Sequence, residues 1–578
     1  MAWSVAAVLA VGLAVVALLH FDRSSEPKIT QLTRDTGFTG EPALSADGKL
    51  VAYVSHRSGR AGPEIWVQQV AGGQPVLLTK PPLTGWWPQI SPDGTTVFFN
   101  SPQEGGGIYA IPALGGGERL VHKGPVNSYR LSPDGAWIAF NPGQAIGEEI
   151  LLNVVPSGGG TPRRVETSLR SNHVSGWSPD GKFILVSEVR LNNWQSDNTA
   201  SLYAVPIKGG RASPIVTPDG KPVSTLGIQW VDERFLMTVR RGTVSAIEQY
   251  RLQAGRWGLV GPPRRLVSFP GALLAFSANP GGLVVFSTMT ETSDLWSLPV
   301  DAERGVVTGS TRRLTNDEAT ERVPTLSADA SKLVYTSDRG GNRDVWLREM
   351  RTGKETQITA TPETEKRAGI SPDGAKIAYE VEGQTHSICA RDLAGGEPKL
   401  VCRDCDRPIW TPDSRRVTFF TGSPAYYYSL DVASSERTRI FPTAKFIIST
   451  LWFSNDGRWV CFNGSSAGKM RVFVAPVKDG KAAGEGEWIP ITETGPYNAQ
   501  WSPGGSVLYF FNPTKTGLDI AAQPLDPVTK RPRGKIVPVF TPPAGHFLRD
   551  ISFFVGHDQL LMSVVESKGN LWKVEAEP

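Results

Sequence analysis

ISPDGTTVFF at residues 90–99 and LSPDGAWIAF at 131–140 are two copies of one short motif that recurs along the chain. Ser-Pro-Asp-Gly suits a type I turn, because Ser favours its first position, Pro presets φ at the second and Gly is common at the fourth. The apolar, β-branched and aromatic residues that follow predict a strand. Each copy therefore predicts a tight turn that leads into a buried strand.

The motif repeats at a spacing that indicates a propeller. Including decayed copies there are twelve units, about 40–53 residues apart, and the other ten stand at 44–53, 177–186, 229–237, 276–286, 326–335, 370–379, 410–419, 453–462, 501–510 and 553–562. An apolar–aromatic pair such as Ile65-Trp66, a glycine turn and a last strand such as PVLLT follow in most units. Four short antiparallel strands at this period are typical of a propeller blade. We interpret the aromatic pairs as core packing between blades.

The twelve units form two halves. Leu32 matches Leu314 and Ser45 matches Ser327, both at an offset of 282. We therefore predict an all-β fold of two tandem six-bladed β-propellers with four-stranded antiparallel blades, at residues 29–310 and 311–578. The alternative is a single twelve-bladed or irregular assembly. We expect ITQLT (29–33) to complete the blade that contains Trp296, and TRRLT (311–315) to complete the blade that contains Trp572, because such pairing protects sheet edges.

The N-terminus differs from the rest. Residues 2–19 are 18 apolar or small residues without charge, nearly enough to cross a bilayer as a helix. We expect a transmembrane anchor at 1–20 with a linker at 21–28; a cleaved signal sequence is the alternative, although no basic n-region or small-x-small site is present. Basic residues after the segment favour a cytoplasmic location for the bulk. A helix that starts at residue 2 looks like a chain cut off upstream, however, and we expect single-pass insertion in the inner membrane with periplasmic or extracytoplasmic propellers.

Composition excludes several classes of protein. The net charge of +4 and the 20% of charged residues argue against a nucleic-acid partner, which requires a concentrated basic face. Four cysteines are too few for a disulfide scaffold, and seven scattered histidines make a metal site improbable. We find no zinc, kinase, phosphate-loop or dinucleotide motif. GSSAG at 464–468 lies between two expected strands, outside the context of a nucleophile elbow. We expect no cofactor and no enzyme activity.

The turn, the apolar–aromatic pair, the Gly-Gly turn and the L-T strand together resemble the TolB-like β-propeller repeat family. The resemblance covers residues 29–578. Members include the periplasmic TolB protein, which binds protein partners, and the non-catalytic propellers of prolyl-oligopeptidase-like and tricorn-like peptidases. The chain is also similar to the helix-plus-propeller ectodomain part of bacterial membrane-anchored Ser/Thr kinases and winged-helix regulators. It lacks the separate N-terminal domain of TolB, so a direct Tol–Pal role does not follow.

Three cysteines lie close together in the sequence. If Leu393 faces Pro398, the hairpin SICARDL–AGGE–PKLVC puts Cys389 opposite Cys402. The alternatives are a Cys402–Cys405 disulfide and free thiols. We expect a structural role in each case.

Binding residues are expected where the innermost strand of each blade begins, because loops on a rigid ring carry function. Arg367 and Arg407 each stand four residues before the Ser or Thr of their turn, and with Arg322 they predict a positive channel mouth for a carboxylate or an acidic peptide. Rim charges paired with Glu321 or Glu365 are the alternative. Trp86 and Trp87 are either an exposed aromatic anchor or buried between blades. The other candidates are Glu41, Tyr129, Asn172, His173, Tyr497 and Asn498.

These observations predict a membrane-anchored, non-enzymatic scaffold or sensing ectodomain that binds a protein, a peptide or a small ligand. One alternative is the non-catalytic propeller module of a peptidase or kinase system whose catalytic part is on another chain. A second is a hydrolase with its site in a propeller channel, for which only Glu41 stands at an expected mouth position. The sequence does not predict an oligomeric state.

Overall fold

The expected all-β class is confirmed. A computed structural model of the chain describes residues 28–35, 37–59, 62–80, 83–142, 151–169, 172–189, 200–225, 227–241, 244–253, 255–270, 272–383, 386–421, 426–441, 447–466, 469–493, 495–514, 517–543 and 545–575. Within these residues the helical elements are two 3-10 turns, η1 (Gln103–Gly105) and η2 (Glu485–Glu487). The predicted membrane segment 2–19 lies outside them. No helix in the described part of the chain is long and apolar enough to cross a membrane.

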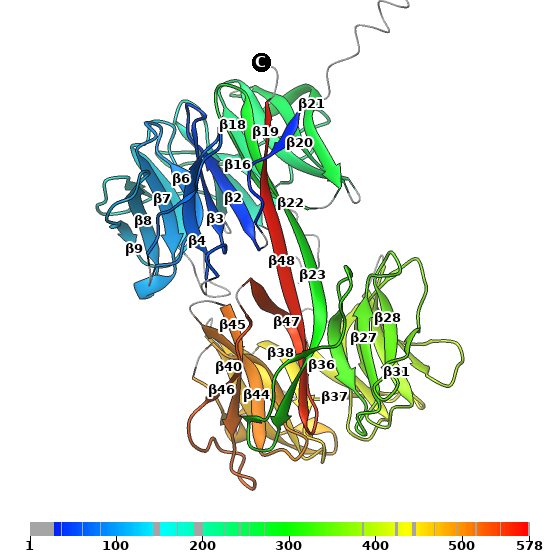
Figure 1. Cartoon of the computed structure of the whole chain (residues 1–578). Helices are drawn as coiled ribbons and strands as arrows, with labels where there is room; N and C mark the ends of the chain where they lie inside the picture. The colour runs from blue at the N-terminus through cyan, green and yellow to red at the C-terminus, as the bar shows by residue number, and fades with distance from the viewer. Residues whose placement is uncertain are drawn as a thin grey trace, which may run out of the picture.

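The first lobe, blue to green in the upper part of Figure 1, contains five sheets that each have four strands in chain order. Neighbouring strands are antiparallel, as predicted. The strands are β2 (Thr39–Leu44), β3 (Leu50–Ser55), β4 (Glu64–Gln69), β5 (Val76–Leu77); β6 (Trp86–Ile90), β7 (Thr96–Ser101), β8 (Gly107–Pro112), β9 (Arg119–Lys123); β10 (Val126–Leu131), β11 (Trp137–Pro142), β12 (Asn153–Pro156), β13 (Arg163–Arg164); β14 (Asn172–Trp177), β15 (Phe183–Val189), β16 (Ala200–Pro206), β17 (Ser213–Pro214); β18 (Ile228–Val231), β19 (Arg234–Arg241), β20 (Val244–Gln253) and β21 (Gly258–Pro270).

The second lobe, below it in Figure 1, contains five sheets of the same kind, one of which has a fifth short strand. Its strands are β26 (Arg322–Leu326), β27 (Lys332–Ser337), β28 (Asp344–Glu349), β29 (Glu355–Gln357); β30 (Thr364–Ile370), β31 (Lys376–Glu382), β32 (His386–Asp392), β33 (Lys399–Arg403); β34 (Cys405–Trp410), β35 (Arg416–Thr421), β36 (Tyr426–Asp431), β37 (Arg437–Arg439); β38 (Ile447–Phe453), β39 (Trp459–Ser466), β40 (Lys469–Lys478), β41 (Lys481–Ala482), β42 (Ile489–Pro490); β43 (Tyr497–Trp501), β44 (Val507–Thr514), β45 (Gly517–Pro524) and β46 (Val537–Phe540).

The repeated motif forms the predicted tight turn and adds a side-chain clasp to it. Ser371 Oγ donates to Asp373 Oδ1 at 2.6 Å and accepts from the backbone N–H of Lys376 at 2.9 Å. Asp373 Oδ1 also accepts from the N–H of Ala375, and Gly374 has a φ of 68° that favours glycine. The same Ser/Thr–Asp pair recurs at 45/47, 132/134, 178/180, 327/329, 411/413 and 454/456.

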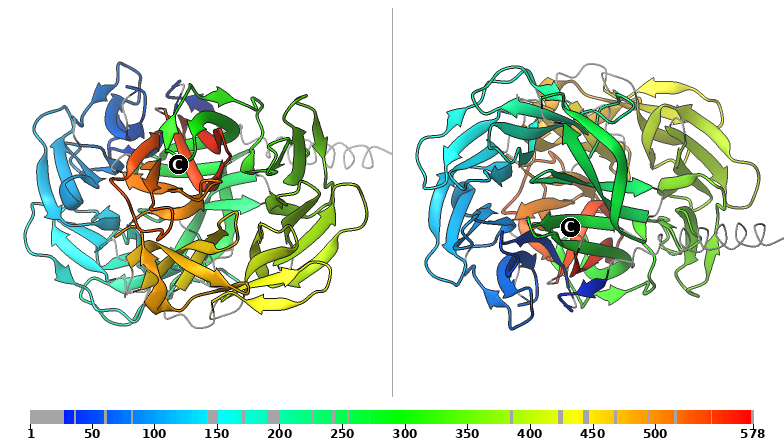
Figure 2. Two further views of the ribbon diagram at one scale, coloured as in Figure 1. Left: turned by 90° about the horizontal axis from the view of Figure 1, so that it is seen from below. Right: turned by 90° about the horizontal axis from the view of Figure 1, so that it is seen from above.

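Side chains of the inner strands join neighbouring sheets around each lobe. Gln229 Nε2 on β18 donates to the carbonyl of Ala278 at 3.0 Å, and Gln500 Nε2 on β43 donates to the carbonyl of Phe553 at 2.7 Å. The N–H of Leu44 donates to Ser277 Oγ, which brings the first sheet of the chain against the last one of its lobe. Figure 2 shows the sheets of each lobe arranged around a centre. Buried aromatic and aliphatic side chains fill the space between successive sheets.

The apolar–aromatic pairs serve this packing in part. The aliphatic members such as Ile65 and Val345 are fully buried, whereas Trp66 and Trp346 are half-buried. The guanidinium of Arg57 lies 5.0 Å from the centre of the Trp66 ring. Arg339 lies 4.6 Å from that of Trp346. An arginine side chain thus stacks on each of these indoles.

One sheet belongs to both lobes. It contains β1 (Ile29–Gln31), β22 (Ala272–Ala278), β23 (Leu283–Asp301), β24 (Val306–Val307), β25 (Arg312–Arg313), β47 (His546–Val555) and β48 (Gln559–Glu575). The long strands β23 and β48 pair with each other and run side by side from one lobe to the other (Figure 1).

The predicted closure of the two halves is wrong, because the pairing is the reverse. β1 pairs with β48 and places Gln31 opposite Trp572, while β25 pairs with β23 and places Arg313 opposite Trp296. The reason is that β23 and β48 continue straight where we expected them to turn back. Consequently residues 293–299 lie in the second lobe and residues 569–575 lie in the first, so the predicted boundary at 310/311 does not separate the strands of this sheet.

The register of the shared sheet also orients the inner strands. β22 begins at Ala272, opposite Met289, and β47 begins at His546, opposite Glu566. Both starting points lie at the middle of the β23–β48 pair, where Met289 faces Gly569. The inner strands β22 and β47 therefore begin where the two lobes meet and run away from each other.

Candidate binding site in the second lobe

Inner strands in both lobes begin with a bulge that places one residue at positive φ. Arg367 (φ 46°), Arg407 (φ 63°) and Asn498 (φ 55°) stand at this point in the second lobe, each beside a register shift. Glu41 (φ 53°) and Trp87 (φ 52°) are the equivalents in the first lobe. A bulge turns the strand and redirects a side chain, which explains why the position four residues before the turn is special.

The bulge positions also show that the three expected arginines are not equivalent. Val323 (φ 54°), not Arg322, holds the bulge position of β26. Arg322 is shifted by one residue and does not line the cavity described next. The sequence therefore places two arginines, rather than three, at equivalent points.

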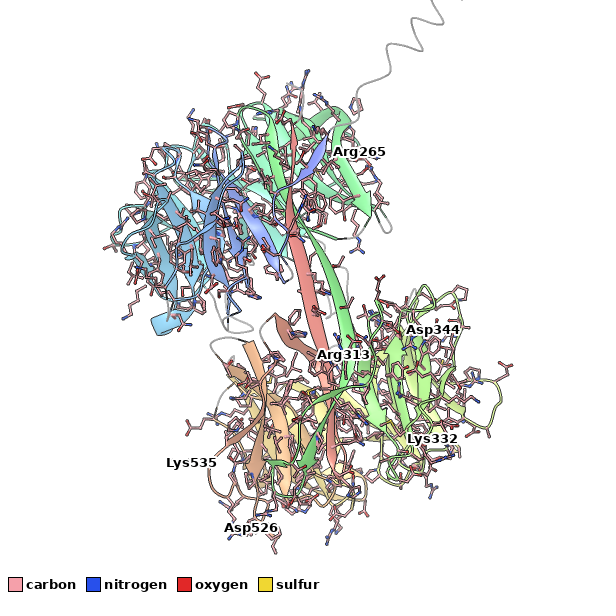
Figure 3. The ribbon with its side chains drawn as sticks, in the orientation of Figure 1. Arg265, Arg313, Lys332, Asp344, Asp526 and Lys535 are labelled. Atoms are coloured by element: carbon pink, nitrogen blue, oxygen red, sulfur yellow. A yellow bond between two sulfur atoms is a disulfide. The ribbon has the colours of Figure 1, made fainter. Side chains whose placement is uncertain are left out.

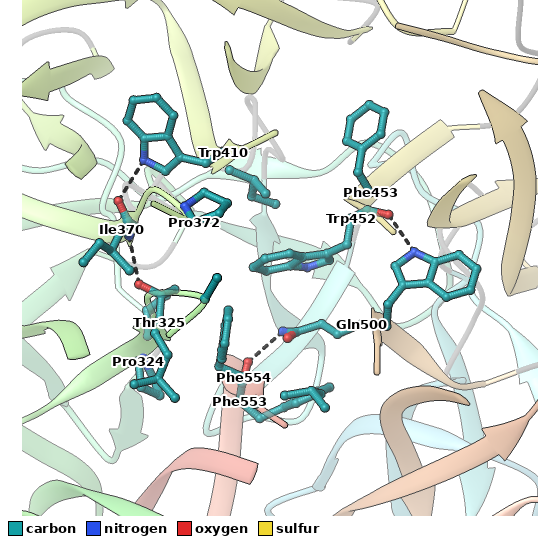
Figure 4. A pocket seen from close by; sticks show the side chains of 18 of the residues that line it. Pro324, Thr325, Ile370, Pro372, Trp410, Trp452, Phe453, Gln500, Phe553 and Phe554 are labelled. Atoms are coloured by element: carbon teal, nitrogen blue, oxygen red, sulfur yellow. Dashed lines mark hydrogen bonds between the residues drawn. The ribbon is translucent and has the colours of Figure 1, made fainter. Parts of the chain in front are cut away.

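Inner strands of the second lobe enclose an apolar cavity of about 160 Å³. Trp410, Trp452 and Trp501 line it, together with Phe553 and Phe554. Figure 4 shows Trp452 and Phe554 pointing into it from different strands. The indoles of the other two tryptophans are fixed by hydrogen bonds from Nε1, Trp410 to the carbonyl of Gly369 at 3.0 Å and Trp501 to that of Trp452 at 3.1 Å. We did not predict these aromatic residues, although each stands within two residues of its turn motif.

Asn498 places an unsatisfied amide on this cavity. Its side chain is 1% exposed, and neither Oδ1 nor Nδ2 has a hydrogen-bond partner in the described part of the chain. Its backbone N–H donates to Asn463 Oδ1 at 2.7 Å, which fixes the residue. The Nε1 of Trp452 is likewise buried without a partner among the described residues. Buried polar groups left unpaired cost about 1–3 kcal/mol, so these atoms point to a ligand that supplies both an acceptor and a donor.

The two arginines of the cavity are balanced by carboxylates. Arg367 lies 2.7 Å from Glu380 Oε2 and 3.8 Å from Asp406 Oδ2. The Nε of Arg407 lies 3.3 Å from Asp406 Oδ1, and its NH1 donates to the carbonyl of Ser449. Burial raises the pKa of Asp406 against the lowering effect of Arg367. Two guanidinium groups thus face two carboxyl groups, which weakens the argument for an acidic ligand.

The predicted neighbours of these arginines lie elsewhere. Glu321 contacts Arg339 at 3.2 Å and accepts from Ser337 at 2.9 Å. Glu365 accepts from Thr361 at 2.7 Å and from Thr359 at 3.1 Å. Burial raises the pKa of both carboxyl groups to about 7. Both residues connect neighbouring sheets, and neither lines the cavity.

Tyr497 is half-buried beside the cavity-lining Asn498. Its ring lies 5.6 Å from that of Phe511 and packs on the apolar core between β43 and β47. Its aromatic ring therefore has a packing role.

The candidate residues of the first lobe lie close to one another, but their hydrogen bonds connect successive sheets. The N–H of Trp87 donates to Glu41 Oε2 at 2.7 Å, and the hydroxyl of Tyr129 donates to the carbonyl of Trp87 at 2.5 Å. Trp86 and Trp87 are half-buried and pack on the cores of two successive sheets. Burial raises the pKa of Glu41 to about 7, and burial followed by the nearby Arg130 lowers the pKa of His173 to about 4. Asn172 opens β14, but its side chain is outside the described atoms.

The cysteines form one of the expected alternatives. Cys402 and Cys405 are joined by a disulfide, and Cys389 and Cys461 are free thiols. The expected facing of Cys389 and Cys402 is wrong, because a bulge shifts the register so that Cys402 lies opposite Ile388 and Cys389 opposite Leu400. In the described residues no cluster of His, Cys, Asp or Glu is arranged to hold a metal ion.

Comparison with known proteins identifies a related domain. The family model described as TolB beta propeller domain matches residues 28–223 and 261–426. An uncharacterised protein of Agrobacterium fabrum (strain C58) is 31% identical over 134 residues, which are 21% of this chain and 45% of that protein. A protein TolB homolog of Chlorobium chlorochromatii (strain CaD3) is 26% identical over 140 residues, which are 24% of this chain and 32% of that protein.

A solved structure of TolB from Acinetobacter baumannii is similar at 15% identity and a TM-score of 0.35, over 54% of this chain and 79% of that one. The chain spans less than half the length of either curated relative named above.

Proposed function

Because this chain belongs to the TolB β-propeller domain family, we propose that it is a non-enzymatic scaffold that binds a protein or peptide segment in the cavity of its second lobe. The observation that carries the proposal is the unpaired amide of Asn498 on an otherwise apolar cavity. An apolar, aromatic-lined pocket with a convergent polar group has the features of a ligand-binding site.

We propose that each lobe is a six-bladed propeller. Five sheets lie in each lobe, and each half of the shared sheet would supply the sixth blade. A closed ring is rigid because every blade is held between two neighbours. The inner-strand bulges can then hold side chains at the cavity in fixed positions.

The size and chemistry of the cavity define the ligand class. An apolar cavity of about 150 Å³ accommodates a benzene ring, and this one has about 160 Å³. The cavity therefore fits one aromatic side chain, which gains apolar contact with Trp452 and Phe554. A backbone amide next to that side chain supplies the acceptor and the donor that Asn498 requires. The partner is thus a protein segment with an exposed aromatic residue, and an acidic residue beside it adds little because Glu380 and Asp406 already balance the arginines.

Binding is tested with N-acetyl-phenylalanine amide as the probe, followed by calorimetry and by tryptophan fluorescence. Asn498→Gly removes both polar atoms and keeps the positive φ without strain. Two lost hydrogen bonds of about 0.5–1.5 kcal/mol each predict a roughly 5- to 140-fold weaker affinity. The matched control is Asn127→Gly, an exposed amide on the inner strand β10 of the first lobe.

Unchanged affinity in Asn498→Gly, or an equal loss in Asn127→Gly, contradicts the proposed site. Absence of probe binding to the unmodified chain contradicts the proposed ligand class. Hydrolysis of the probe, followed by mass spectrometry, would instead indicate an enzyme.

We also propose that residues 2–19 attach the chain to the inner membrane, with both lobes outside the cytoplasm. The support is the length and the lack of charge of this segment. Fractionation of cells that express the full chain and a chain without residues 2–19 tests the attachment. Alkaline phosphatase fused to the C-terminus is active only outside the cytoplasm, so an inactive, well-expressed fusion overturns the location.

A further inference from the structure

β23 and β48 each supply a strand to both lobes (Figure 1). Leu283 lies opposite Glu575 at one end of the pair and Pro299 lies opposite Gln559 at the other, with an unbroken antiparallel register between them. In the first lobe, residues 283–289 and 569–575 are the second and third strands of the shared sheet. In the second lobe, residues 559–566 and 293–299 take these places.

The repeats show to which half each third strand belongs. VVFSTMTETSDLWSL (284–298) and LLMSVVESKGNLWKV (560–574) are equivalent copies, so Trp296 and Trp572 occupy the same place in their halves. Yet Trp296 lies opposite Met562, and Trp572 lies opposite Phe286. Each lobe therefore contains the third strand that the other half of the sequence encodes.

We infer that the two halves are joined by a reciprocal strand exchange, so that neither lobe closes its ring without the other half and the two fold and unfold as one unit. The inference concerns the joining of the lobes and is independent of the proposed binding function.

In the alternative, turned-back form, each second strand would pair with the third strand of its own half. If each copy turned back on itself, Phe286 would face Trp296 and Met562 would face Trp572. This requires three-residue turns at 290–292 and 566–568. Short hairpin turns need residues that accept positive φ, chiefly Gly, Asn and Asp. Thr290-Glu291-Thr292 contains two β-branched residues that favour an extended strand instead.

Gly569 is the glycine next to these segments, and its surroundings fit the exchanged form. A Cβ there would lie 2.7 Å from the carbonyl oxygen of Thr39 and 3.2 Å from that of Thr288. Its φ lies outside the left-handed region, so close approach of neighbouring backbone, rather than a turn, explains the glycine.

Side chains and flanking strands also fasten the exchanged strands in place. The N–H of Leu32 donates to the carbonyl of Leu571 at 2.8 Å, and the N–H of Leu314 donates to that of Leu295 at 2.7 Å. Arg313, labelled in Figure 3 beside the long strands, lies 2.7 Å from Asp294 of β23 and 3.6 Å from Glu566 of β48. One arginine thus contacts a carboxylate from each half of the sequence.

Paired cysteines distinguish the two topologies. Leu283→Cys with Glu575→Cys places two thiols on directly opposed residues of the exchanged strands, where cross-strand Cβ atoms are close enough to be bridged. Leu283→Cys with Pro299→Cys places its two thiols on opposed residues only in the turned-back form. Each pair is introduced into the full chain, oxidised, and mapped by mass spectrometry against its single-cysteine variants, which account for Cys389 and Cys461.

The exchange predicts a 283–575 disulfide and no 283–299 disulfide; the opposite pattern overturns it. A second measurement covers variants that fail to fold. A protease site inserted between Asp317 and Glu318, which are exposed, cuts the chain between the halves. Exchanged halves stay together on gel filtration until denaturant is added and then melt in one transition. Fragments that separate under native conditions, or two separate transitions of the uncut chain, contradict the inference.

Discussion

The carboxylate of Glu303 takes the place of an aspartate that is absent from the turn at residues 502–505. A double variant that restores the aspartate tests this role. The copy WSPGG has Gly504 where other copies have the Asp that accepts from the turn serine. Glu303, from the hairpin that follows β23, instead accepts from Ser502 Oγ at 2.9 Å, from the N–H of Gly504 at 2.6 Å and from Ser506 Oγ at 2.5 Å. These hydrogen bonds hold the pKa of Glu303 below its usual value although burial raises it.

Glu303→Ala removes all three hydrogen bonds. Bonds to a charged group are worth about 1.5–3 kcal/mol when buried and less when water competes, and Glu303 is exposed. We therefore expect a total loss of about 1–2 kcal/mol in the free energy of unfolding, measured by urea denaturation. Glu303→Gln retains an acceptor and should lose roughly half as much.

Gly504→Asp supplies the rescue, with opposite effects in the two backgrounds. In the unmodified chain it destabilises, because a Cβ at this position would lie 2.7 Å from Glu303 Oε2 and two carboxylates would compete for the same donors. In the Glu303→Ala background it restores the clasp that Ser371 and Asp373 form elsewhere and should recover most of the loss. Additive effects of the two substitutions would refute the replacement.

The remaining predictions concern other parts of the chain. Burial raises the pKa of Glu41 from 4.5 to about 7. Between these pH values the folded state keeps the carboxyl proton that the unfolded chain has released. The free energy of unfolding therefore falls as the pH rises from 4.5 to 7. The Glu41→Gln variant should therefore be more stable than the unmodified chain at pH 8 but not at pH 4. The measurement is the free energy of unfolding in urea as a function of pH, and the same pH dependence in both proteins would contradict this. Gln229→Leu removes the bonds of Nε2 to the Ala278 carbonyl and of the Ala278 N–H to Oε1; it should cost about 1–3 kcal/mol in thermal or urea unfolding, whereas a loss below about 0.5 kcal/mol would show that water replaces both bonds. Titration of the denatured chain should find two thiols without reductant and all four cysteines after reduction, and four thiols before reduction would exclude the disulfide.

Part of the candidate site follows from local sequence. Arg367, Arg407 and Asn498 share one distance from their turn motifs, and the bulge of the inner strand confirms that these positions are equivalent. The balancing carboxyl groups could not be found in this way, because Glu380 comes from the second strand of its sheet and Asp406 from the residue before a bulge. The aromatic lining needs the ring itself, since Trp452 and Phe554 are about 100 residues apart in sequence and meet at 6.3 Å between ring centres.

Turn chemistry, strand alternation and the offset of 282 residues determine the repeated four-stranded sheets and the duplication, because these signals act within about 50 residues of chain. Only the tertiary structure decides which half completes which lobe. A second strand pairs with the third strand of the other half in the exchanged form and with that of its own half in the turned-back form. These two third strands are equivalent copies, so the strand patterns do not distinguish the two forms. What distinguishes them is the conformation of residues 290–292 and 566–568. The β-branched Thr290 and Thr292 favour an extended strand locally. Both segments are extended in the structure, where β23 and β48 gain a continuous partner along their whole length.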